Sequence, residues 1–235
     1  MMNDTLLIIL YSSAAGLPIF IGGLISSLFQ AHNTILKDEI NHWIVAFGGG
    51  ALMSAIAFAL IPKALNELPS GLIIVVFLAG TFSFMGLDML STRIGGSIAQ
   101  VVSMMMDFIP EALALGASFA YDHKFGLLLA IFIGLQNLPE GFNSYVELRE
   151  KMRRRSVLAL LLALSTVGIV ASLTGEILLK DNLKVIHSIM LLAGGGILYL
   201  IFQDIAPMSK RKNDWVPATG ACVGFLIGML GDKIL

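Results

Sequence analysis

Oxygen-bearing side chains interrupt two apolar stretches of this sequence at matching places. The stretches are MMMDFIPEALALGASFA, residues 104–120, and FGLLLAIFIGLQNLPEGFNSYVEL, residues 125–148. Aligned on their prolines, they read Asp107-x-x-Pro110-Glu111 and Gln136-x-x-Pro139-Glu140. Residues four apart share one face of a helix, so Asp107 lies over Glu111, and Gln136 lies over Glu140. Two such faces turned toward each other would bring four oxygen-bearing side chains together, an arrangement that binds cations.

The two prolines add backbone oxygen at the same place. A proline inside a helix has no N–H, so the carbonyl four residues earlier loses its helical hydrogen bond. Pro110 therefore frees the carbonyl of Met106, and Pro139 frees that of Leu135. Interrupted helices that expose carbonyls at mid-membrane are a recurrent way to build cation sites.

The acids in these stretches need a partner. A third acid, Glu176, lies in the apolar stretch STVGIVASLTGEILL. An acid at the centre of a membrane helix costs about 2.5–3.5 kcal/mol. The sequence places no lysine or arginine at comparable depth, so a metal ion or protons are the natural partner. The alternative interpretation is that the polar groups pair with one another and hold helices together.

The composition indicates an integral membrane protein. Of the 235 residues, 57% are hydrophobic and 13% are charged, whereas soluble domains carry about 25% charged residues. The net charge of −1 argues against a nucleic-acid partner, and the single cysteine, Cys222, excludes an intrachain disulfide and a cysteine-rich metal site. The first apolar run is not preceded by a basic segment, and it is longer than the apolar core of a signal peptide. We therefore predict that it is retained as the first membrane span.

Eight apolar segments are long enough to span a bilayer, which takes about 20 helical residues. The predicted spans are 5–29, 42–65, 71–92, 96–120, 125–147, 156–179, 184–206 and 215–232. The connections between them are short and polar, with no room for a soluble domain. We therefore predict one all-α transmembrane domain over residues 1–235.

The basic residues predict the orientation, because lysine and arginine gather in short cytoplasmic loops. With the N-terminus outside, the connections after the first, third, fifth and seventh spans are cytoplasmic. They hold ten of the fifteen basic residues: Lys37, Arg93, Arg149, Lys151, Arg153, Arg154, Arg155, Lys210, Arg211 and Lys212. We expect both termini outside a cell membrane, namely the cytoplasmic or inner membrane of a prokaryote.

The order of these motifs resembles the ZIP family of divalent metal transporters over essentially the whole chain. The QNLPEG of the fifth span is the most specific feature, with a matching Pro-Glu in the fourth. FGGGALMSAIAFALIPKAL, LTGEI and AGGGILYLIFQDIAP resemble the second, sixth and seventh spans of that family. The resemblance implies eight helices in a 3+2+3 inverted-repeat bundle, an elevator-type carrier and a homodimer. The two Gly-Gly-Gly runs are predicted to permit close helix approach.

The resemblance also implies a ligand set. The family motif in the fourth span is usually His-Asn-x-Pro-Glu-Gly, so Asp107 takes the place of its histidine and Phe108 that of its asparagine. The metal ligands implied for the two adjoining sites are Asp107, Glu111, Gln136, Asn137, Glu140 and Glu176. The second of these sites comprises Asn137 and Glu176, together with Glu111 and Glu140, which also belong to the first site. Because Phe108 replaces an asparagine ligand, this second site lacks one ligand.

These observations predict a carrier that imports divalent transition metals, with zinc first and iron, manganese, cobalt or cadmium as further candidates. Carboxylate and amide oxygen favour harder ions than imidazole does. The metal is the transported substrate rather than a cofactor. One alternative is a proton- or cation-coupled transporter of another substrate on a similar fold. An intramembrane metalloenzyme is disfavoured, because none of the four histidines lies mid-span.

Overall fold

The computed structural model describes residues 4–29, 35–119, 122–179, 181–212 and 214–234, and these are helical with no strand among them. The elements are α1 (Asp4–Phe29), α2 (Ile35–Ala55), η1 (Ile56–Leu60), α3 (Ile61–Glu67), α4 (Ser70–Ile94), α5 (Gly96–Phe119), α6 (His123–Arg149), α7 (Arg154–Leu179), α8 (Leu183–Leu200), η2 (Ile201–Ile205), α9 (Ala206–Ser209) and α10 (Val216–Ile234).

The helices follow the apolar segments of the sequence. Each predicted span corresponds to one helix or, for the second and seventh, to one helix continuing through a short π-helical segment. The main difference is α2, which begins at Ile35 rather than at residue 42 because the helix continues through the polar residues ahead of the apolar run. Residue 120, the last of the fourth predicted span, lies outside the described residues.

Seven helical segments of the described chain are long and apolar enough to cross a membrane, which supports a multi-pass membrane protein. The eighth predicted span corresponds to α10, which is not among these seven. Its 19 residues include the charged pair Asp232 and Lys233 at one end, and several glycines lower its hydropathy further. The structure by itself thus shows an all-helical membrane protein with seven candidate spans.

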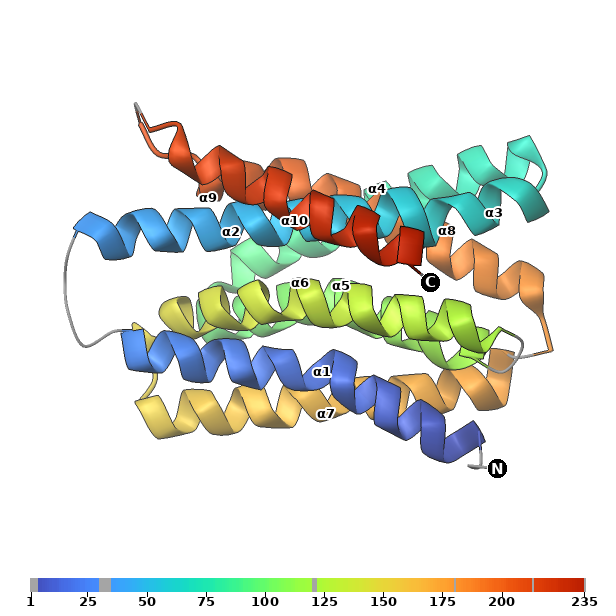
Figure 1. Ribbon diagram of the computed structural model, residues 1–235, viewed down its shortest axis with the longest axis horizontal. Helices are drawn as coiled ribbons and strands as arrows, with labels where there is room; N and C mark the ends of the chain where they lie inside the picture. The colour runs from blue at the N-terminus through green and yellow to red at the C-terminus, as the bar shows by residue number, and fades with distance from the viewer. Residues whose placement is uncertain (1–3, 30–34, 120–121, 180, 213, 235) are drawn as a thin grey trace.

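The helices form two groups that pack side by side (Figure 1). The first, here called the α6 bundle, contains α1, α5, α6 and α7, with the most extensive contacts between α1 and α6. The second, called the α2 bundle, contains α2 to α4 and α8 to α10, and is held mainly by the α2–α10 and α4–α8 pairs. The two groups meet where α2 contacts α6 and where α8 contacts α5.

Glycines let four helix pairs approach closely. In each pair, a glycine of one helix faces a backbone carbonyl of the other, and the relation is reciprocal. The pairs are α1–α6 (Gly22 at Leu138, Gly141 at Ile19), α5–α7 (Gly116 at Ser172, Gly175 at Leu113), α2–α10 (Gly50 at Ala221, Gly224 at Phe47) and α4–α8 (Gly80 at Leu192, Gly195 at Phe77). Small residues at helix contacts are the usual means of association in membranes, and the prediction for the two Gly-Gly-Gly runs is confirmed at Gly50 and Gly195.

Two π-helical segments interrupt the α2 bundle at corresponding places. In η1 the N–H of Ile61 bonds to the carbonyl of Ile56, and in η2 the N–H of Ala206 bonds to that of Ile201. A proline follows each segment, Pro62 and Pro207. A proline cannot donate the next helical hydrogen bond, and a single π-turn is a common local adjustment that often marks a functional segment.

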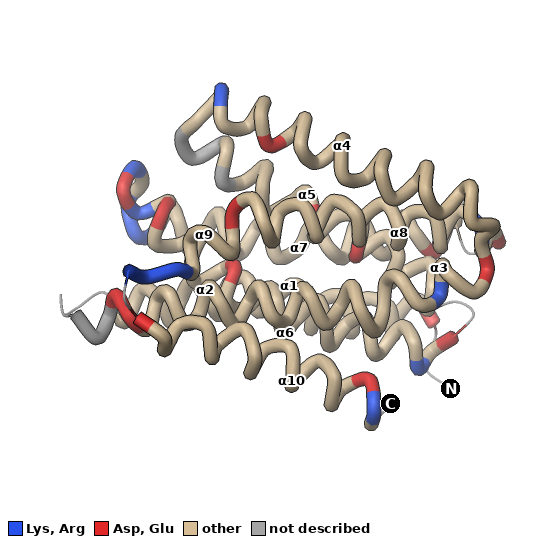
Figure 2. The backbone as a smooth tube through the Cα atoms, turned by 90° about the horizontal axis from the view of Figure 1, so that it is seen from above, with Lys and Arg blue, Asp and Glu red and all other residues tan. Residues whose placement is uncertain are grey.

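The ends of the helices sort into two sides. Figure 1 shows the start of α1 and the junction of α3 with α4 at one end of the molecule, and the ends of α1, α6 and α9 at the other. Basic segments are found where α4 and α9 end (Figure 2). At this end Arg211 pairs with Asp38 and with Asp214, each at 3.1 Å. The network ties the start of α2 to the connection between α9 and α10.

Candidate cation site

The predicted ligands of the first site come from two neighbouring helices. α5 carries Asp107 and Glu111, and α6 carries Gln136 and Glu140. Both helices continue without a break through Pro110 and Pro139, so the expected interruption is limited to the missing proline N–H. The two predicted pairs of oxygen-bearing side chains therefore lie on uninterrupted helices that contact each other.

A buried hydrogen bond joins the two helices at this level. Gln136 donates from Nε2 to the Glu111 carboxylate, and both side chains are buried. The other amide oxygen, Oε1 of Gln136, has no hydrogen-bond partner among the described residues. A buried acceptor without a partner costs free energy, and Gln136 also lines a cavity. This oxygen is available to a cation.

Asp107 lies one helical turn closer to the predicted cytoplasmic end than Glu111. Its side chain is 5% exposed, and its Oδ1 accepts a hydrogen bond from the backbone N–H of Phe108 at 2.8 Å. This contact uses one lone pair of one oxygen and fixes the carboxylate close to its own backbone. The second oxygen is left for other partners, and the residue lines the cavity.

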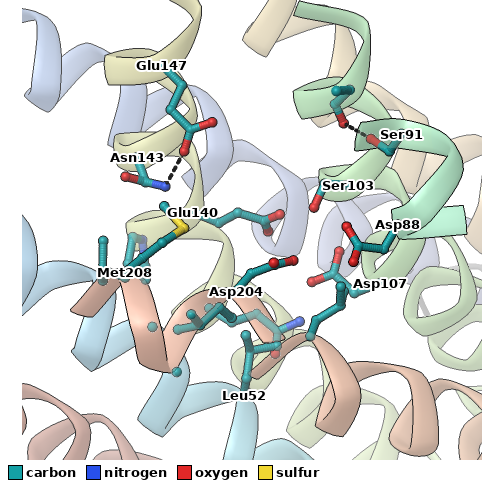
Figure 3. Close-up of a pocket in the computed structure, with 18 of the residues that line it drawn as sticks. Leu52, Asp88, Ser91, Ser103, Asp107, Glu140, Asn143, Glu147, Asp204 and Met208 are labelled. Carbon is teal, nitrogen blue, oxygen red and sulfur yellow. Dashed lines mark hydrogen bonds between the residues drawn. The ribbon is translucent and has the colours of Figure 1, made fainter. Parts of the chain in front are cut away.

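The cavity has a volume of about 430 Å³ and lies between the two bundles. Figure 3 shows the carboxylates of Asp88, Asp107, Glu140 and Asp204 directed into the same space, with the hydroxyl of Ser103 beside them. Its other polar lining residues are Ser91, Thr92, Gln136, Asn143, Glu147 and Lys151. The side-chain nitrogen and sulfur atoms among the lining residues that the structure describes belong to Lys151, to the amides of Gln136 and Asn143, and to the Met208 thioether.

The acidic side chains line this cavity but do not converge on a single position. Among the residues that the structure describes, no three His, Cys, Asp or Glu side chains are close enough together to hold one metal ion. A water molecule takes up about 30 Å³ in the liquid, so a cavity of about 430 Å³ has room for an ion that keeps part of its water shell.

The residues expected at the second site are placed differently. Asn137 is buried and donates from Nδ2 to the carbonyl of Ala15 on α1 at 2.7 Å, while its Oδ1 has no partner among the described residues. Glu176 is half-buried on α7 and does not line the cavity. The ring of Phe108 is buried and packs where Gly168 of α7 leaves room. The structure thus does not place Asn137, Glu176 or Glu111 among the cavity-lining residues.

Several lining residues were not among the predicted ligands. Asn143 and Glu147 are joined by a hydrogen bond of 2.9 Å. Asn143 follows Glu140 by three residues, and Glu147 follows Asn143 by four. This periodicity is the signal that could have identified them, because it continues one face of α6. Asp88 and Asp204 come from α4 and η2, far apart in the sequence, and no spacing relates them.

Tyr199 connects one of these acids to the α2 bundle. Its hydroxyl donates to Oδ2 of Asp88 at 2.9 Å, which joins α8 to α4. Asp88 lines the cavity together with Asp204, which lies five residues after Tyr199. The wall of the cavity formed by the α2 bundle is therefore acidic as well.

No protein-family model matches the chain. The chain is 32% identical over 149 residues to a curated protein named zinc transporter GufA, from Myxococcus xanthus. The aligned region covers 61% of this chain and 58% of that protein, so the chain spans little more than half the length of the relative that it matches.

Proposed function

We propose that the chain is a ZIP-like membrane carrier that imports divalent transition-metal ions through the cavity between its two bundles. The observation that carries this proposal is the convergence of Asp107, Gln136 and Glu140 on one cavity, whose only basic lining residue within the described part of the chain is Lys151, just beyond the end of α6. Buried acids without a basic partner at the same depth favour an external cation. The similarity to a protein named a zinc transporter supports the same class of substrate.

Under this proposal the chain has eight spans arranged as an inverted repeat, with α10 as the eighth. The helix contacts support it, because they occur in pairs that such a repeat would generate. If α1, α2 and α4 correspond to α7, α8 and α10, and α5 corresponds to α6, then the α2–α10 pair corresponds to α4–α8, and α1–α6 corresponds to α5–α7. The π-helical segments η1 and η2 correspond in the same way.

The cavity is proposed to open toward the cytoplasm. Lys151, Met208 and Thr92 are lining residues near the ends of α6, α9 and α4, the ends whose connections carry most of the basic residues. An arrangement with both termini outside places these ends inside. The described conformation is then open to the inside, and metal would leave through the acidic walls formed by Asp88, Asp204 and Glu147.

Transport requires that the site also face outward. We propose that the α6 bundle moves against the α2 bundle as an elevator, carrying Asp107, Glu111, Gln136 and Glu140 with it. In the outward state these side chains would close on the ion, with the unpartnered Oε1 of Gln136 as one ligand. Zinc is the first candidate ion, and iron, manganese, cobalt and cadmium follow, because all accept carboxylate oxygen.

Metal uptake into proteoliposomes tests the proposal. We expect the wild-type chain to take up at least one ion from zinc, manganese, iron, cobalt and cadmium, and the Glu111→Gln/Glu140→Gln variant to lose at least 90% of that uptake. The substitution keeps side-chain size and removes only the charge. The matched control is Glu67→Gln, because Glu67 is exposed at the end of α3, and Figure 1 shows the junction of α3 with α4 at the opposite end of the molecule from the end of α6.

The outcomes separate the function classes. Uptake that disappears in the double variant and persists in the control supports a metal carrier. No uptake of any divalent ion by protein that is folded in the membrane refutes it and favours a proton- or cation-coupled transporter of another substrate. Equal uptake by the wild type and the double variant would mean that the carboxylates are structural.

A further inference from the structure

A second cavity lies at the surface of the α2 bundle; it shares Gly49 and Ile205 with the first cavity but has no acidic residue in its lining. It has a volume of about 640 Å³ and is a groove between α2, the η2–α9 segment and α10. Its lining is almost wholly apolar and includes Met53, Phe202, Phe225 and Met229. Phe202 and Met229 are 66% and 41% exposed. In a membrane this face meets lipid rather than water.

The groove is elongated along the helices. On α10 its lining runs from Ala221 to Met229, a length of about 12 Å at 1.5 Å per helical residue. On α2 it runs from Ala46 to Met53. Membrane helices are tilted by about 20° on average from the bilayer normal. The groove therefore runs in the direction that a lipid acyl chain takes.

The end of the groove nearest the α9–α10 connection is positively charged. Ser209 lines the groove, and Lys210 follows it directly in the chain, with Lys212 two residues further. Both lysines are exposed and neither forms an ion pair within the described part of the chain. The nearby Asp38 and Asp214 are paired with Arg211. The lysines are therefore the charges available to a ligand at this mouth.

Aromatic residues mark the same end as the membrane boundary. Trp215, immediately before α10, is 87% exposed. Trp43 on α2 donates from its indole N–H to Oγ1 of Thr219 at 3.0 Å. Tryptophans are enriched where a membrane protein passes through the lipid head groups. The two lysines therefore lie at the level of the phosphates, with the apolar groove leading from that level into the hydrocarbon.

We propose that this groove holds an acyl chain of an anionic phospholipid whose phosphate contacts Lys210 and Lys212. Basic sites between membrane helices bind anionic head groups, and the groove supplies the apolar surface for the chain below. A second copy of the protein is a poorer occupant, because a parallel two-fold pair would bring the same lysines together, and like charges oppose association. The proposal is independent of the transported substrate.

Tryptophan fluorescence of the full chain in lipid nanodiscs tests this binding. The sequence has two tryptophans: Trp43 lies on α2 and Trp215 immediately precedes α10, and both helices form the groove. Phosphatidylglycerol with an acyl chain brominated near the head group is added stepwise to phosphatidylcholine discs, and the same brominated chain on phosphatidylcholine is the comparison. We expect half-maximal quenching at a mole fraction at least threefold lower for the anionic lipid.

Matched variants locate the site. Lys210→Gln/Lys212→Gln should abolish the preference, whereas Lys124→Gln/Lys184→Gln removes the same charge at the opposite end and should preserve it. Cys222→Phe fills the groove and should weaken quenching, whereas Cys222→Ala should not. Identical curves for the two lipids, or a preference that survives the first lysine pair, would overturn the proposal. An efficient Cys222–Cys222 cross-link between two chains in the membrane would also overturn it, because it would make a second copy the occupant.

Discussion

At the scale of the residue, the donor atoms of the proposed site would decide which ions it prefers. The side chains that line the cavity offer carboxylate, amide and hydroxyl oxygen, and no histidine or cysteine is among them. Oxygen ligands suit manganese and magnesium, while imidazole raises the affinity for zinc, copper and nickel. Asp107 is the residue at which this balance is most easily changed, because it is buried and lines the cavity.

The first prediction follows from this donor set. Asp107→His should shift the ratio of zinc to manganese uptake toward zinc by roughly tenfold, which corresponds to about 1.4 kcal/mol of relative binding free energy. The measurement is competitive uptake of the two ions into proteoliposomes. Asp232→His, at the exposed end of α10, is the control and should leave the ratio unchanged. An unchanged ratio in Asp107→His would remove Asp107 from the set of metal ligands.

At the scale of the element, α6 is the helix that positions most of the site. Its N-terminus is capped by Asp122, whose Oδ1 accepts a hydrogen bond from the backbone N–H of Phe125 at 3.0 Å. Lys63 on α3 lies 3.3 Å from the other carboxylate oxygen. Further along, Gly141 packs against the carbonyl of Ile19 on α1. The helix is therefore held at its start and in its middle by two different contacts.

The second prediction concerns the cap. The hydrogen bond from Phe125, together with Lys63, lowers the pKa of Asp122 below its usual value. Asp122→Ala should lower the free energy of unfolding by about 0.5–2 kcal/mol at neutral pH, as loss of an N-cap does. A carboxylate with a lowered pKa in the folded state contributes stability above its unfolded pKa, about 3.9. That contribution is lost as the pH falls through the lower folded-state value.

Thermal unfolding in detergent across a pH series measures this effect. Asp122→Asn keeps an oxygen that accepts the cap hydrogen bond but does not titrate, so it serves as the control. The difference in melting temperature between wild type and Asp122→Asn should be constant at neutral pH and shrink below about pH 4. A difference that instead grows on acidification would contradict the assigned direction of the pKa shift.

The third prediction concerns close helix approach. A Cβ on Gly141 would overlap the backbone of Ile19, whereas Gly86 on α4 has nothing within 4 Å. Gly141→Ala should therefore separate α1 from α6 and reduce thermal stability, with a loss of metal uptake. Gly86→Ala should be neutral or stabilising by up to about 1 kcal/mol, because alanine favours the helix. Equal melting temperatures of the two variants would show that the α1–α6 contact adapts without cost.

At the scale of the whole molecule, the cavity lies where the two bundles meet. Its walls come from α5 and α6 on one side and from α2, α4 and the α8–α9 segment on the other. Relative movement of the bundles would therefore change the access of the cavity directly. On α5, Ser103 lines the cavity, whereas Ser118, four turns further along, is fully buried.

The fourth prediction tests this access. In a Cys222→Ala background, Ser103→Cys should react with a membrane-impermeant maleimide applied from the side at which α6 ends, and a transported metal should slow the reaction. Ser118→Cys should be unreactive from either side in the described conformation. Labelling of both positions at the same rate would mean that the cavity is not restricted to one side. The measurement is the mass shift of the protein in oriented vesicles.

Several features of the site follow from the spacing along α5 and α6. Because the period of a helix determines which residues share a face, the positions of Asp107, Gln136 and Glu140 at one cavity could be predicted. Glu111 accepts a hydrogen bond from Gln136 and does not line the cavity, and its role as a metal ligand stays a prediction. The direction in which a buried side chain such as Glu111 points is decided by the packing around it, and the spacing of residues along the helix does not predict it.

The sequence by itself determined the helices, because about 20 consecutive apolar residues must satisfy their backbone hydrogen bonds internally in a membrane. It also determined which acids lie within those helices. Only the tertiary structure decided which acids share the cavity. Asp88 and Asp204 reach it from helices remote in sequence, and Glu176 is kept out of it. The physical reason is that helix rotation and packing depend on close contacts between helices, such as those at Gly116 and Gly141, and these are set by the partner helices rather than by the local sequence.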